Sequence, residues 1–154
     1  MPRLEVGETA PDFTLADHDG QSITLEALRG QRVVLYFYPA DDTPGCTKEA
    51  CQFNEALEAF SKTDTDVLGI SPDGAESHRK FRSKYGLGLT LLSDPDHVVM
   101  ERYGAYGEKT LYGRKTVGVI RSTFVIGPDG TIEQAWYNVR ADGHAAKVLA
   151  TVGG

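Results

Sequence analysis

The sequence lacks the features that mark several large classes of protein. It has only two cysteines, a formal net charge of −6, and no apolar run near the about 20 residues that span a bilayer. The negative charge argues against non-specific binding to nucleic acid or to anionic membranes, because both depend on clustered lysine and arginine. No apolar signal core precedes Asp12. We therefore expect a cytoplasmic protein.

Motifs for metals and nucleotides are also missing. The four histidines, at positions 18, 78, 97 and 144, are scattered and form no paired ligand spacing, and no glycine-rich nucleotide loop is present. We expect neither a metal nor a cofactor. A chain of 154 residues with ordinary apolar and charged content suits one globular domain spanning residues 1–154. Two cysteines in a cytosolic chain point to catalysis or metal binding sooner than to a structural disulfide.

Both cysteines follow the most apolar stretch of the chain. Val33–Tyr38 is β-branched and aromatic, which predicts a buried strand, and Pro39 ends it because proline has no N–H for a sheet. A turn follows, and then a helix for which Thr43 suits the N-cap and Pro44 the first position. Cys46 is therefore predicted in the first turn of a helix, just beyond the end of a strand.

This position favours the reactive form of a cysteine. Unpaired N–H groups and the peptide dipoles favour an anion at a helix start, and the thiolate is the nucleophilic form of cysteine. Cys51 lies five residues further along the same helix. Helix geometry puts the two Cα atoms roughly 8.6 Å apart, whereas a disulfide needs about 6.8 Å or less. A bond between Cys46 and Cys51 would therefore require the helix to unwind locally.

Strand and helix patterns alternate along the rest of the chain. Strands are predicted at 13–16, 22–25, 67–70, 89–92, 119–126 and 131–137, and helical segments at 25–28, from 44 through about 60, at 75–85, from 94 to about 103, and at 144–152. Gly104–Gly118 is rich in glycine and charge and is interpreted as a long surface loop. This order predicts an α/β fold with a mixed central sheet and helices on both faces.

Several of these segments resemble one family. Pro39-x-x-x-Thr43-x-x-Cys46 resembles the active-site pattern of the peroxiredoxins, and the run from Thr43 to Cys51 is similar to their bacterioferritin comigratory protein or PrxQ branch. Further similar motifs lie at 7–13, 70–73, 77–81 and 121–126, so the resemblance covers nearly the whole chain. It implies a single domain with the thioredoxin-like fold.

The resemblance also implies roles for the residues of the motif. Cys46 would be the peroxidatic cysteine, Thr43 would orient the peroxide, and Pro39 would shield the thiolate from bulk water. Both latter residues could instead have only structural roles, as the N-cap and the strand terminator. Ala40 and Asp42 depart from the lysine and asparagine expected in this branch, which makes the loop less positive.

Arg121 and Cys51 each have a second interpretation. The resemblance places Arg121 beside the thiolate, where its permanent charge would stabilise the anion, but an arginine at a strand end could also turn to solvent. It identifies Cys51 as the resolving cysteine, which forms an intrachain disulfide with Cys46. Cys51 could instead be a core residue that faces inward with Phe53 and Leu57.

These features together predict a thiol-dependent peroxidase. Its substrates would be hydrogen peroxide and organic hydroperoxides, and the resemblance implies thioredoxin as the dithiol reductant and a monomeric protein. A thiol–disulfide oxidoreductase on the same fold is a rival, although it would use Cys-x-x-Cys rather than the four-residue spacing found here. A non-enzymatic redox sensor, whose helix opens on oxidation, is a second rival.

Overall fold

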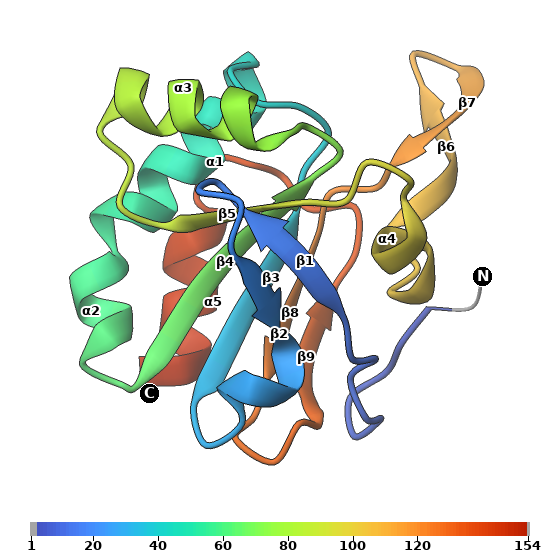
Figure 1. Ribbon diagram of the computed structural model, residues 1–154. Coiled ribbons are helices and arrows are strands. Elements are labelled where there is room, and N and C mark those ends of the chain that lie inside the picture. The colour runs from blue at the N-terminus through green and yellow to red at the C-terminus, as the bar shows by residue number, and fades with distance from the viewer. Residues whose placement is uncertain (1–2, 154) are drawn as a thin grey trace.

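A mixed sheet forms the centre of the protein. In the computed structural model, which describes residues 3–153, seven strands pair in the order β2-β1-β5-β4-β3-β8-β9 (Figure 1). Their bounds are β1 Thr14–Asp17, β2 Ser22–Thr24, β3 Arg32–Phe37, β4 Thr65–Ser71, β5 Thr90–Ser93, β8 Ser122–Ile126 and β9 Ile132–Trp136. Strand β3 lies in the interior of the sheet, parallel to β4 and antiparallel to β8.

Helices cover both faces of this sheet, as the sequence predicted. They are the 3₁₀ helix η1 Leu25–Leu28 and the α-helices α1 Pro44–Glu55, α2 Leu57–Ser61, α3 Ala75–Tyr85, α4 Val98–Arg102 and α5 His144–Gly153. Val34 and Tyr36 of β3 pack with residues of α1, α2, α3 and α5 on one face. Leu35 and Phe37 of β3 pack on the other face with residues of η1, α4 and the N-terminal segment. The alternation of side chains along β3 thus divides the core into two layers.

Gly69 of β4 leaves the space that Tyr36 fills. A Cβ atom at Gly69 would lie 2.8 Å from Tyr36 Cζ and 2.9 Å from Leu91 Cδ2. Tyr36 is fully buried and stacks on Phe53, with ring centroids 4.6 Å apart, so it has little room to move. We expect Gly69→Ala to lower the free energy of unfolding by about 1–3 kcal/mol, the usual range for overpacking a core. Urea denaturation of both proteins measures this difference, and an unchanged midpoint would contradict it.

The segment predicted as a long loop is instead a hairpin. Strands β6 Tyr106–Leu111 and β7 Arg114–Val119 pair in antiparallel register as a separate two-stranded sheet that projects from the body (Figure 1). Tyr112 and Gly113 form its tip, both with positive φ (53° and 77°), as a two-residue hairpin turn with the favoured twist requires. Most of β7 is exposed, so the alternation of apolar and polar residues that reveals a half-buried strand is missing.

Two helix boundaries also differ from the prediction. The helix expected to run through Phe60 is interrupted at Ala56, whose N–H donates to the carbonyl oxygens of both Gln52 and Phe53. The helix expected from Asp94 begins only at Val98, and the Asp94 carboxylate accepts a bond from the Met100 N–H. Helix α1 itself begins at Pro44, as predicted, so the position of Cys46 in its first turn is confirmed.

Candidate active site

Cys46 and Arg121 meet at the end of the central strand. Cys46 lies in the first turn of α1 and is only 2% exposed, and Nη2 of Arg121 lies 3.1 Å from its Sγ. The sheet register explains this meeting. Phe37, the last residue of β3, pairs with Ser122, so Arg121 stands beside the point where the chain leaves β3 for the loop and α1. Arg121 therefore does not turn to solvent; it directs its guanidinium at the cysteine.

Glu49 is the third member of this cluster, and the sequence analysis missed it. Its buried Oε1 accepts a bond from Nη1 of Arg121 at 2.5 Å, while Oε2 is buried without a hydrogen-bond partner. Burial raises the pKa of Glu49 to about 7, although the charge of Arg121 opposes this shift. Burial alone would lower the pKa of Arg121, but the negative charges of Glu49 and Cys46 raise it. The i,i+3 spacing of Cys46 and Glu49, which puts both on one helix face, was the available signal.

Thr43 and Pro39 flank the cysteine on its loop side. Thr43 occupies the N-cap position of α1, as predicted, but its side chain makes no capping bond. Its hydroxyl donates instead to the carbonyl oxygen of Ala40 at 2.9 Å. Pro39 and Arg121 line an open cavity of about 610 Å³, to which the hairpin contributes Lys109. This cavity gives small molecules a route towards the guanidinium that contacts Cys46.

Cys51 lies in the same unbroken helix as Cys46. Both cysteines are free, and Cys51 is half-buried against the core layer that contains Phe53. Burial, and then the charge of Glu55, raises the pKa of Cys51. In the folded helix Cys51 is therefore held as a thiol, and the helix between the two cysteines is intact. Their separation in an ideal helix exceeds the reach of a disulfide, so any bond between them still requires unwinding.

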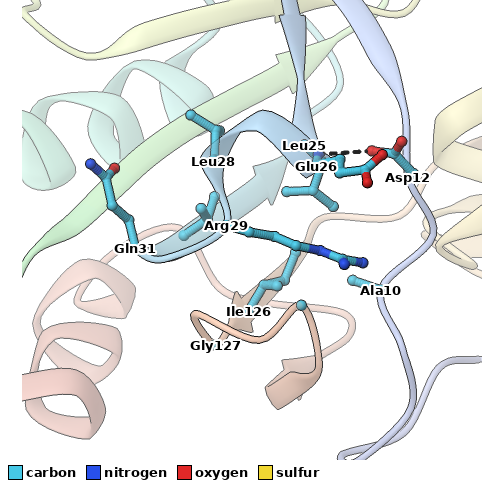
Figure 2. A pocket seen from close by; sticks show the side chains of 11 residues that line it. Ala10, Asp12, Leu25, Glu26, Leu28, Arg29, Gln31, Ile126 and Gly127 are labelled. Atoms are coloured by element: carbon cyan, nitrogen blue, oxygen red, sulfur yellow. Dashed lines mark hydrogen bonds between the residues drawn. The ribbon is translucent and has the colours of Figure 1, made fainter.

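A second, smaller cavity lies at the other end of β3. Leu25, Arg29, Ile126 and Gly127 are among its lining residues (Figure 2), and its volume is about 20 Å³. Such a volume holds about one water molecule, too little for a substrate. Val33, the second residue of β3, also lines it, whereas Cys46 follows the last residue of that strand. The open cavity beside Arg121 is therefore the better candidate for substrate entry.

The remaining titratable groups do not assemble a metal centre. Among residues 3–153, no group of three or more His, Cys, Asp or Glu side chains could hold a metal ion. His144 is bonded to the Thr123 hydroxyl at 2.8 Å, and burial, followed by the charges of Lys147 and Arg121, lowers its pKa to about 4. Within the same described part of the chain, no helix is long and apolar enough to cross a membrane.

A cysteine in the first turn of a helix, with an arginine guanidinium against its sulfur, is an arrangement that suits the thiol chemistry of a peroxidase. The chain belongs to the AhpC/TSA family, whose model matches residues 6–135, and within it to the Bcp/PrxQ peroxiredoxins. It is 42% identical to peroxiredoxin Bcp of Escherichia coli, over 97% of this chain and 96% of that protein. Peroxiredoxin Bcp of Bacillus subtilis is 39% identical, over 97% of this chain and 95% of its own length.

Solved structures of peroxiredoxins of this branch have the same fold as this chain. Peroxiredoxin Q of Xanthomonas campestris matches with a TM-score of 0.88 and 40% identity, covering 97% of this chain and 94% of that one. A cysteine-to-serine mutant of PrxQ from Xylella fastidiosa matches with a TM-score of 0.91 and 36% identity, covering 98% and 96%. The predicted thioredoxin-like fold is thereby confirmed, and the protein is a thiol peroxidase of the oxidoreductase class.

Proposed function

We propose that Cys46 is the peroxidatic cysteine of this peroxidase. Its thiolate attacks the terminal oxygen of a hydroperoxide, an S–O bond forms, and the O–O bond breaks. The sulfur is oxidised by two electrons to a sulfenic acid, and the leaving oxygen takes up a proton and departs as water or an alcohol. The observation that carries this assignment is the 3.1 Å contact between Arg121 Nη2 and Cys46 Sγ in the first turn of α1. A permanent positive charge there stabilises both the thiolate and the negative charge that develops on the peroxide oxygens.

Thr43 and Pro39 act beside the thiolate in this proposal. Thr43 lies three residues before Cys46, and its hydroxyl can accept one bond while it donates another. Because its one hydrogen goes to the Ala40 carbonyl oxygen, its lone pairs are left to accept a bond from a peroxide, and Arg121 supplies the donor. Pro39 lies on the wall of the open cavity next to Arg121, where its ring limits the access of bulk water. Thr43 still occupies the N-cap position, although without a capping bond, and Pro39 still lies just beyond the end of β3.

Cys51 resolves the sulfenic acid in the second step. Its sulfur attacks the sulfur of Cys46, a disulfide forms, and the hydroxyl of the sulfenic acid leaves as water. The raised pKa of Cys51 and the intact helix oppose this step in the folded protein. Unwinding of α1 removes both obstacles, because it brings the sulfurs together and exposes the thiol to water. It costs a few backbone hydrogen bonds at about 0.5–1.5 kcal/mol each.

A dithiol reductant then restores both thiols. Thioredoxin is the reductant that the Bcp/PrxQ membership supports, and it belongs to the systems that keep cytosolic thiols reduced. We propose hydrogen peroxide and organic hydroperoxides as substrates. One Xanthomonas campestris relative, the bacterioferritin comigratory protein, is described by its alkyl peroxide reduction activity, and it is 40% identical to this chain, covering 97% of this chain and 95% of that one. The open cavity beside Arg121 has room for an organic group.

Steady-state peroxide consumption, with thioredoxin and its reductase supplied, tests these roles. The wild type should turn over continuously, Cys46→Ser should lose all activity, and Cys51→Ser should lose turnover with thioredoxin while still reacting once with peroxide. Peroxide-treated wild type should show a Cys46–Cys51 disulfide by mass spectrometry and a reduced helical signal by circular dichroism. A single stoichiometric burst in the wild type would instead identify a redox sensor. Mixed disulfides with external thiols alone would leave Cys51 as a core residue.

A further inference from the structure

The loop before Cys46 is hydrogen-bonded to helix α3, and α3 supplies none of the groups proposed to react. This loop, residues 38–43, connects β3 to α1 and ends just before the first turn that contains Cys46. Two consecutive carboxylates in it, Asp41 and Asp42, both bond to side chains of α3. We call this set of contacts the α3 clamp, and it consists of Asp41, Asp42, Ser77, His78, Lys84 and Tyr85.

Asp41 forms the buried half of the clamp. Its side chain is only 3% exposed, and it accepts bonds from the Tyr38 hydroxyl at 2.5 Å, the Ser77 hydroxyl at 2.8 Å and His78 Nδ1 at 2.7 Å. The other ring nitrogen of His78 lies 3.0 Å from the carbonyl oxygen of Leu92. The two ring nitrogens of His78 thus join the loop carboxylate of Asp41 to the backbone of β5. Moving the loop at Asp41 would break these bonds and leave a buried carboxylate short of donors, which costs free energy. The three bonds therefore hold the loop in place.

Asp42 forms the exposed half of the clamp. Its φ of 56° lies in the left-handed region, which non-glycine residues seldom adopt. Its carboxylate accepts bonds from Lys84 Nζ at 2.8 Å and from the Tyr85 hydroxyl at 2.5 Å. Hydrogen bonds from Lys84 and then Tyr85 also lower the pKa of Asp42. Asp42 stands two residues before the start of α1, so this backbone reversal sets the direction in which the chain enters the helix.

We propose that the α3 clamp consists of positioning residues that hold Cys46 against Arg121 and resist the unwinding of the first turn of α1. The proposal rests on the assignment of Cys46 as peroxidatic and Cys51 as resolving cysteine. Its consequence differs between the two chemical steps. The attack on peroxide needs Cys46 in the folded helix, whereas the formation of the disulfide needs Cys46 released from it. The clamp therefore speeds the first step and slows the second.

Variants of the exposed half of the clamp test its effects on the two chemical steps without changing Asp41 or the side chains bonded to it. The double variant Lys84→Met, Tyr85→Phe removes both donors to Asp42, and Asp42→Ala removes the acceptor. Lys80→Met is the matched control. Lys80 lies on α3 one turn before Lys84, but its ion pair is with Glu76 of the same helix rather than with the loop. Asp42→Asn keeps an acceptor for Tyr85, so this variant should behave more like the wild type than Asp42→Ala does in both steps.

The two steps are measured separately by stopped-flow kinetics with hydrogen peroxide. The first step is followed in a Cys51→Ser background, where the reaction stops at the sulfenic acid, and the second by disulfide formation in the two-cysteine protein. Both clamp variants should slow the first step about tenfold, because small displacements of reacting groups cost rate steeply. They should also speed disulfide formation several-fold. Lys80→Met should match the wild type in both steps.

Opposite changes in the two steps exclude a general loss of stability. A variant that was less stable without loosening the start of α1 would show a lower unfolding temperature, with no reason for one step to slow and the other to speed up. Unchanged rates, or changes in the same direction in both steps, would overturn the clamp while the proposed peroxidase cycle stood. If Cys46 of the wild type failed to react with peroxide, the proposed function itself would fail, and the clamp with it.

Discussion

Arg121→Ala is expected to slow the reaction of Cys46 with hydroperoxide by about 10²–10³-fold, the usual cost of removing one donor to a developing oxyanion. Arg121 is the side chain that contacts Cys46 Sγ, at 3.1 Å, and it is only 17% exposed, so water does not easily replace it. The variant should still fold. It removes the charge that opposes the raised pKa of Glu49, so this buried carboxyl can remain protonated and neutral.

Two further arginine variants make this test specific. Arg121→Lys keeps a positive charge, but a single ammonium group lacks the planar fork that bonds Glu49 and Cys46 together, so its rate should lie between those of wild type and Arg121→Ala. Arg32→Ala is the matched control. Arg32 forms a 2.6 Å ion pair with Glu133 and begins β3, at the end opposite to Cys46. It should react at the wild-type rate, and an unchanged rate in Arg121→Ala would remove Arg121 from the site.

The sheet and its main helices were predictable because their sequence signals are local. The apolar run at Val33–Tyr38, the Thr43-Pro44 helix start and the glycine after Tyr85 each have a direct physical reason to form one structure. Helix α3 begins and ends where the sequence placed it, and Gly86 has the left-handed conformation that commonly closes a helix. Such signals depend on backbone hydrogen bonding and burial within a few residues, so a single sequence contains them.

The hairpin β6–β7 shows where this approach fails. Its strands make a separate sheet that is largely exposed, so no buried face imposes an alternation of apolar residues. The Tyr112-Gly113 turn was the remaining signal, between two runs of equal length. The glycines and charges of the flanking segments are instead typical of a surface loop. The hairpin nevertheless matters for the site, because Glu108, Lys109 and Thr110 line the open cavity next to Arg121.

The residues proposed to react were named from the sequence, whereas the buried side chains that contact them were not. Cys46 and Arg121 are 75 residues apart, and only the family resemblance indicated that they meet. Glu49 and His78 were missed because a polar or charged side chain on a helix is normally expected to face solvent. Glu49 is buried with Arg121 as its partner, and His78 is buried with Asp41. Each partner comes from a distant part of the chain, and spacing along one sequence does not reveal such pairs.

Glu49→Gln is expected to remove a pH dependence of stability that the wild type carries. Below about pH 4.5 the Glu49 carboxyl is protonated in both the folded and the unfolded chain, and above about pH 7 it is ionised in both. Between these values only the folded state keeps the proton, because its pKa is raised by burial. The folded state therefore binds more protons, and the free energy of unfolding falls as the pH rises through this window. The pKa of Glu49 differs between the unfolded state, at 4.5, and the folded state, at about 7, and this difference corresponds to a decrease in the free energy of unfolding on the order of 3 kcal/mol.

Glutamine isolates this contribution because it preserves the shape of the side chain and the acceptor for Arg121 Nη1, yet has no proton to release. Urea denaturation of both proteins across this pH window gives the difference in their free energies of unfolding. His144, whose lowered pKa acts in the opposite direction, is present in both proteins and cancels. Glu49→Ala should lose the same slope with an additional constant penalty for the cavity it creates. A slope in Glu49→Gln equal to that of the wild type would mean that Glu49 releases its proton at the same pH in both states. Arg121 would then face a full carboxylate at neutral pH, and its charge would be shared between Glu49 and the Cys46 thiolate.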